Sequence, residues 1–137
     1  MARLETRARA RALQALFAWD VRVDTPLDRI AAHVWDDLEV AVDERAFADA
    51  LLGVVQEQGA ALDAELSDVT TNWRLERLGA IERCVLRLGA AELSQGITPP
   101  RVIIQEAVRL AERFGSAQSA RFVNGVLDAL ARRMGRI

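Results

Sequence analysis

The chain has 137 residues, of which 51% are hydrophobic and 28% charged, and its formal net charge is −2. This length and apolar content suit one folded domain and exclude a disordered chain. No apolar run approaches the roughly 20 residues that a membrane-spanning helix needs. No apolar segment follows the first arginines as it would in a secretion signal, so we expect a cytoplasmic protein.

The small net charge conceals an uneven distribution along the chain. Residues 1–20 carry four arginines against two acids, residues 21–70 three against twelve, and residues 71–137 eleven against six. If the two basic ends meet in space, a nearly neutral protein still presents a basic surface. All 18 basic residues are arginine, whose planar guanidinium suits phosphate contacts and base stacking.

Apolar residues recur three and four positions apart along most of the chain, which predicts an all-α fold of about seven helices. The prolines stand where periodic stretches begin, as the preference of proline for a first helical turn predicts. The expected helices span residues 4–20, 26–38, 43–66, 73–78, 80–93 and 100–114, followed by a last helix containing residues 120–134.

The first helix is predicted to bury an alanine- and leucine-rich side. At 100° per residue, the opposite side carries Arg3, Arg7, Arg11 and Gln14. Arg9 does not join them. It lies four residues after Glu5, in the favourable order for an ion pair within the helix.

Three further features concern how the helices end and pack. The helix at residues 80–93 is apolar on two sides and is predicted to be central, with Gly89 allowing a close neighbour. The polar residues 67–72 are typical of an internal boundary, which separates sub-bundles at about 1–66 and 73–137. Gly115 is expected to end its helix in the left-handed conformation.

The sequence offers little support for catalysis. His33 is the only histidine, so a zinc site lacks ligands, and Cys84 stands inside an apolar helix, as an inert buried thiol does. No glycine-rich phosphate loop occurs. We therefore expect no enzymatic activity, no metal and no cofactor.

Three stretches of sequence are unusual when taken together. The first is the arginine-rich run at residues 7–17. The second begins at residues 73–78 and continues through residues 81–88 to Glu92 and Leu93. The third comprises residues 106–111, Phe114-Gly115 and Phe-Val-Asn-Gly-Val-Leu-Asp at residues 122–128. In this order and spacing, from about Arg7 to Asp128, the chain resembles the NusB family of bacterial transcription antitermination factors.

The resemblance implies a fold and a function. Members of the family are all-helical, with two small bundles packed together. They bind boxA, a short single-stranded RNA element of leader and ribosomal RNA transcripts, together with ribosomal protein S ten, also called NusE. The complex joins NusA, NusG and RNA polymerase and suppresses termination, without a cofactor. Some members self-associate, so the resemblance leaves a homodimer open.

The resemblance also assigns site residues. The RNA-binding positions implied are Arg7, Arg9, Arg11, Gln14, Arg121 and Phe122, and the S-ten positions are Glu82, Arg83 and Leu86. Arginines position phosphates, and aromatic rings stack on unpaired bases. Glu5 and Thr6 replace two basic residues that are frequent in the family, and Phe17 replaces a frequent tyrosine. Asn124 and Gly125 are expected to be structural, the glycine through close helix contact.

Two other classes of function compete with this one. Some ribosomal RNA cytosine methyltransferases carry a NusB-like N-terminal domain. The present sequence ends at Ile137, soon after the last helix, so we expect no methyltransferase domain here. The other alternative is a helical protein-interaction module without RNA. Binding of a boxA-like RNA distinguishes these classes.

Overall fold

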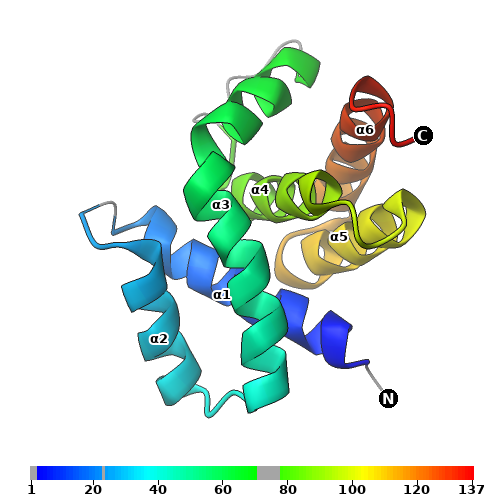
Figure 1. Ribbon diagram of the computed structural model, residues 1–137. Coiled ribbons are helices and arrows are strands. Elements are labelled where there is room, and N and C mark those ends of the chain that lie inside the picture. The colour runs from blue at the N-terminus through cyan, green and yellow to red at the C-terminus, as the bar shows by residue number, and fades with distance from the viewer. Residues whose placement is uncertain (1–2, 23, 71–77) are drawn as a thin grey trace.

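A computed structural model describes residues 3–22, 24–70 and 78–137. Over these residues the chain forms six helices and no strand, which confirms the all-α prediction (Figure 1). The predicted short helix at 73–78 falls almost entirely on residues outside the described ranges. The helices are α1 (Leu4–Asp20), α2 (Leu27–Asp37), α3 (Val42–Val69), α4 (Ala80–Gln95), α5 (Pro100–Phe114) and α6 (Ala117–Arg133).

The helix limits follow the sequence signals closely, with the largest difference at the end of α3. The prediction ended this helix at Leu66, but it continues to Val69. The break therefore begins at Thr70, whose hydroxyl donates to the carbonyl of Leu66 at 3.0 Å. Ser67 and Asp68 were predicted as boundary residues from their capping preference, yet they extend the helix.

Left-handed glycines follow two of the helices: Gly96, with φ of 76°, after α4, and Gly135, with φ of 72°, after α6. The expectation for Gly115 was wrong, because its φ is −122°. Glycine is required there for space, since an added Cβ would lie 2.8 Å from the carbonyl oxygen of Ala111. The chain then turns directly into α6, which Ser116 caps by accepting a hydrogen bond from the Ser119 amide.

Helix α4 forms the centre of the molecule, as its two apolar sides predict. It packs against α1, α3, α5 and α6, and Figure 1 shows it enclosed by these helices. Its side chains Val85 and Leu86 are fully buried. Gly89 faces Leu127 of α6 so closely that an added Cβ would lie 2.7 Å from the leucine, which confirms the predicted close approach.

The alanines of helix α1 form the side that packs against neighbouring helices. Ala8, Ala12 and Ala15 are completely buried, and α1 contacts α2, α3 and α4. Small side chains let the helix backbones approach closely, so one side of α1 is enclosed while the opposite side stays at the surface. This placement orients the arginine-rich side of α1 outward.

Candidate nucleic-acid interface

The outward side of α1 carries the predicted basic residues. Arg3 is exposed, and the side chain of Arg7 is 44% exposed. The Arg7 Nε donates to Glu44 Oε1 at 2.5 Å, which ties this arginine to the first turn of α3. One turn further on, Arg11 Nη1 donates to Gln14 Oε1 at 3.1 Å. We call Arg3, Arg7, Arg11 and Gln14 the arginine face.

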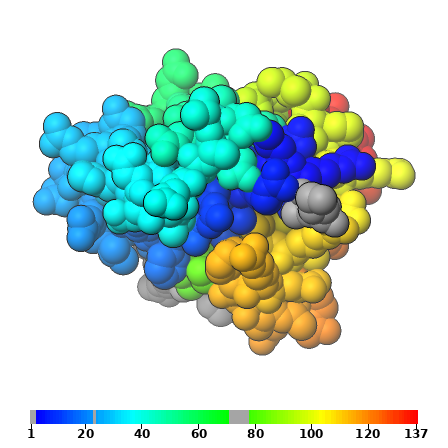
Figure 2. Space-filling model, turned by 90° about the horizontal axis from the view of Figure 1, so that it is seen from below, coloured from blue at the N-terminus to red at the C-terminus, as the bar shows by residue number. Residues whose placement is uncertain are grey.

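Figure 2 shows this part of the molecule from below. The dark blue residues at the start of α1 reach the surface between the cyan residues that include the start of α3 and the orange residues where α5 leads into α6. The beginning of α1 and the α5–α6 corner therefore belong to one side of the protein. The sequence left open whether the two basic ends of the chain meet in space, and here the start of α1 lies on the same side as the start of α6.

The start of α6 contributes a second part of the predicted site. Arg121 is exposed, and Phe122 is partly buried against the core. Phe122 lines a pocket of about 460 Å³ with Leu78, Gly79, Glu82, Ser116, Gln118 and Ser119. Glu82 Oε1 accepts a hydrogen bond from the Ser119 hydroxyl at 2.5 Å. Two residues predicted for different ligands, Phe122 for RNA and Glu82 for S ten, thus line the same pocket.

Arg9 does not belong to the arginine face. It is buried, with 4% of its surface exposed, and its guanidinium binds Glu92 of α4 through two hydrogen bonds of 2.8 and 2.6 Å. A third hydrogen bond of 3.0 Å reaches Glu106 of α5. The pair predicted with Glu5 is therefore replaced by two partners distant in sequence, and the guanidinium is turned away from the surface.

The surroundings of Arg9 favour its charged form. Burial alone would lower the pKa of Arg9, but hydrogen bonding to Glu92 and the charges of Glu92 and Glu106 raise it overall. The guanidinium also stands 5.2 Å from the centre of the Phe47 ring, a cation–π distance. Arg9 thus remains a buried cation at the junction of α1, α4 and α5.

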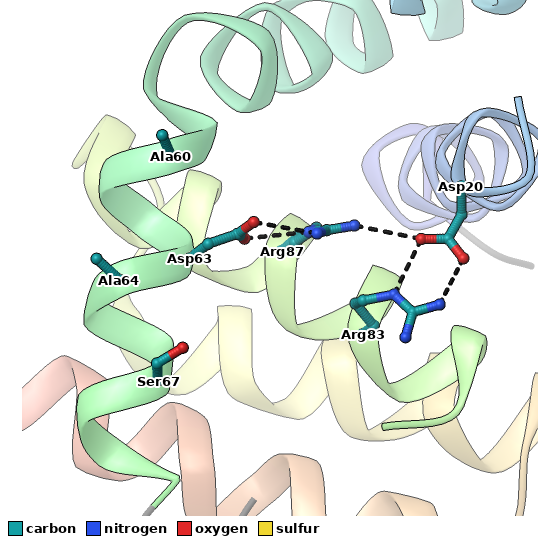
Figure 3. A pocket seen from close by; sticks show the side chains of 7 residues that line it. All are labelled: Asp20, Ala60, Asp63, Ala64, Ser67, Arg83 and Arg87. Atoms are coloured by element: carbon teal, nitrogen blue, oxygen red, sulfur yellow. Dashed lines mark hydrogen bonds and ion pairs between the residues drawn. The ribbon is translucent and has the colours of Figure 1, made fainter. Parts of the chain in front are cut away.

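The predicted S-ten residue Arg83 is engaged at the other end of α1. It binds Asp20 through Nε at 2.9 Å and Nη2 at 2.5 Å, and it donates to the carbonyl of Leu78. Arg87 bridges Asp20 and Asp63 (Figure 3). The Arg83 hydrogen bond lowers the pKa of Asp20, against the opposing effect of burial. These charged residues line a pocket of about 540 Å³ along α3.

Leu86, the third residue predicted to contact S ten, is completely buried in the core. Its side chain offers no surface to a partner, because it points from α4 into the packed interior rather than toward the pockets beside that helix. Burial on two sides of α4 was evident from the sequence. That pattern favoured packing for Leu86 over the surface role taken from the resemblance.

Two expectations about other residues change. Asn124 and Gly125 were expected to be structural through burial and close helix contact, but both are exposed, and nothing lies within 4 Å of an added Cβ at Gly125. Phe17, not among the predicted site residues, is 43% exposed on α1. The sequence signal for this exposure was the position of Phe17 three residues after Gln14, away from the buried alanine side of α1.

The residues considered for catalysis are placed as the sequence suggests. Cys84 is buried, and desolvation raises the pKa of its thiol to about 12, while His33 is exposed. Over the described ranges, no three histidine, cysteine or acidic side chains are grouped so as to hold a metal ion. Among the same residues, no helix has the length and apolar character needed to cross a membrane.

Comparison with known proteins gives consistent results. The NusB family model matches residues 6–132. The chain is 45% identical to the transcription antitermination protein NusB of Sorangium cellulosum over 94% of this chain and 92% of that protein. It is 40% identical to the NusB protein of Caulobacter vibrioides over 91% of this chain and 90% of that protein.

Solved structures show the same relationship. The T. maritima NusB structure superimposes with a TM-score of 0.88 at 32% identity, covering 96% of this chain and 93% of that one. A crystal structure of the antitermination factors NusB and NusE in complex with double-stranded RNA gives 0.89 at 27% identity, covering 97% and 99%. With the family model, the relatives and the fold in agreement, this chain belongs to the NusB family of transcription antitermination proteins.

Proposed function

We propose that this protein binds boxA-like single-stranded RNA together with ribosomal protein S ten (NusE) during ribosomal RNA transcription. In this role it acts in the cytoplasm as a regulator without catalysis. The assembled complex joins NusA, NusG and RNA polymerase and suppresses termination. Family membership supports the proposal, as does the similarity to a NusB structure that contains NusE and RNA.

The observation that carries the proposal is the arginine face of α1. Arg7 and Arg11 lie on the outward side of the helix and are already oriented, by Glu44 and by Gln14. A phosphate that binds Arg7 must compete with Glu44, whose side chain is only 10% exposed, whereas the arginine side chain is 44% exposed and open to a ligand. Pre-orientation reduces the side-chain entropy lost when RNA binds.

The start of α6 supplies the second half of the proposed site. Arg121 is positioned to meet a phosphate, and the ring of Phe122 lies in a pocket where an unpaired base can stack. Glu82, in the same pocket, is the proposed contact to S ten. RNA and S ten therefore meet at the start of α6, so each should tighten the binding of the other by the same factor.

Because RNA and S ten share this pocket, only substitutions outside it should weaken the binding of one ligand without the other. Arg7→Glu combined with Arg11→Glu should weaken RNA binding and leave S-ten binding nearly intact, because both arginines lie on α1 outside the pocket. Glu82→Arg should weaken the binding of both ligands, because Glu82 accepts a hydrogen bond from Ser119 and lines the pocket with Phe122.

The test is an RNA titration of the purified protein with and without S ten, using a boxA-like oligonucleotide and a scrambled oligonucleotide of equal length. If about three phosphates are contacted, log affinity should fall against log salt with a slope of about −2. S ten should increase affinity for the boxA-like RNA more than for the scrambled one. Equal affinity for both RNAs in the presence of S ten would contradict the proposal.

A further inference from the structure

We propose that Arg9 is a positioning residue of the RNA site: its bonds to Glu92 and Glu106 fix how the arginine face is presented. The inference rests on the proposed function. It assigns Arg9 a role that differs from RNA contact. We call Arg9, Glu92 and Glu106 the Arg9 anchor.

The anchor uses every hydrogen-bonding nitrogen of the Arg9 side chain. Nε and Nη2 take the two oxygens of Glu92, and Nη1 takes Oε1 of Glu106. A planar guanidinium held at three points by two carboxylates has little rotational freedom. The bonds join α1 to α4 and α5. The anchor therefore fixes the position of α1 along its axis and its rotation about that axis at Arg9.

The position of Arg9 in α1 transmits this constraint to the surface. Arg7 and Arg11 stand two residues before and two residues after it, about 200° around the helix in each direction. They therefore lie on the side of the helix opposite Arg9, with Arg7 exposed and Arg11 partly buried. A rotation or shift of α1 at Arg9 moves both outward arginines together, away from Glu44 and away from the surface shared with the α5–α6 corner.

Electrostatics gives the anchor a further consequence. It places two carboxylates around one buried cation, with the Thr6 hydroxyl donating to Glu106 and Arg109 3.9 Å from the same carboxylate. Two acids beneath a phosphate-binding face are unfavourable for RNA on charge alone. Neutralising Glu92 should therefore tighten RNA binding if charge dominates, and weaken it if positioning dominates.

This opposite sign makes Glu92→Gln the decisive variant. Glu92 is 2% exposed and lies on α4, so it has no access to RNA. The positioning role predicts that Glu92→Gln weakens boxA-like RNA binding by about fivefold or more, the lower end of typical coupling between separate sites. Arg9→Lys, which keeps the charge and loses the planar fork, should also weaken it. Thermal melts first establish that each variant is folded at the assay temperature.

The matched control is Asp20→Asn, which removes one acid from an arginine pair at the other end of α1. It should leave RNA affinity within about twofold of wild type, below the usual range of coupling between sites. Wild-type or tighter RNA binding by folded Glu92→Gln overturns the proposal. Weakening of the same size in Asp20→Asn also overturns it, because the effect would then belong to general loosening of α1.

A second measurement separates the anchor from the proposed function. If wild-type protein binds no boxA-like RNA even with S ten, the proposed function fails, and hydrogen exchange then decides on the anchor. Glu92→Gln should speed exchange of amides in the first half of α1 more than in the centre of α4. Uniform acceleration, or none, would show that Arg9 does not position this segment.

Discussion

Helix α1 is held at its two ends by arginine–carboxylate networks of similar chemistry and different burial. In the Arg9 anchor, the Arg9 and Glu92 side chains are 5% and 2% exposed. At the other end, the Arg83 and Arg87 side chains are 16% and 20% exposed beside an open pocket (Figure 3), and their partners Asp20 and Asp63 are 11% and 33% exposed. Water can replace a lost partner at the second site but not at the first. The same residue types therefore make a fixed anchor at one end and a solvated network at the other.

The largest effect should come from breaking the buried network. Arg9→Ala leaves Glu92 and Glu106 without their shared cation, and removal of one partner from a buried ion pair costs about 3–5 kcal/mol. The free energy of unfolding, measured by urea denaturation at neutral pH, should fall by that amount. A loss of about 1–2 kcal/mol or less, no larger than expected for the Asp20 network, would show that burial does not distinguish the anchor.

Leu127→Ala gives an apolar comparison for the loss of unfolding free energy expected in Arg9→Ala. Leu127 is completely buried and fills the space left by Gly89 of α4, so its truncation creates a cavity. The expected loss is about 2–5 kcal/mol by the same urea measurement. Leu88→Ala, on the same central helix, should lie in the same range. A loss below about half a kcal/mol in either variant would show that the packing around α4 is misassigned.

The solvated network should give a smaller and pH-dependent effect. Asp20→Asn weakens the charged hydrogen bonds to Arg83 and should cost about 1–2 kcal/mol at neutral pH. Because the pKa of Asp20 is lowered in the folded state, its contribution is present above the unfolded value of about 3.9 and is lost as pH falls through the folded value. The stability difference between wild type and variant should therefore shrink below about pH 4. A constant difference from pH 7 to pH 2 contradicts this assignment.

The smallest effect is expected where an arginine pair is fully at the surface. Arg132 binds Asp128 one turn earlier in α6, with 63% and 43% of the two side chains exposed. Arg132→Ala should change the free energy of unfolding by less than about 0.5 kcal/mol, as exposed pairs in helices do. If Arg132→Ala lowered the free energy of unfolding nearly as much as Arg9→Ala, burial could not explain why the arginine pairs differ in stability.

Much of the fold could be predicted from the sequence because helix signals are local. Residues 4–20 were predicted as a helix with the limits that α1 has, and Pro100 marked the start of α5. The turn at Gly115 was harder. Its glycine is needed because Ala111 and Ser119 approach closely, and that approach depends on how α5 and α6 pack rather than on neighbouring residues.

The candidate site could be predicted only in part, for the same reason. Periodicity placed Arg7 and Arg11 on one face of α1, since both belong to that helix. The partners of Arg9 lie 83 and 97 residues further along the chain, so sequence spacing offered only the nearby Glu5. The pocket shared by Glu82 and Phe122 likewise arises from the packing of α4 against α6.

The most direct test of the account is the affinity of Arg7→Glu/Arg11→Glu for boxA-like RNA, measured by titration with S ten present. The matched control is Arg29→Glu/Arg132→Glu, which makes the same change in net charge at two exposed arginines on α2 and α6. We expect a loss of at least about tenfold for the first pair, since several phosphate contacts vanish, and a much smaller loss for the control. Equal affinities of the two double variants would contradict the assignment of the RNA site to the arginine face.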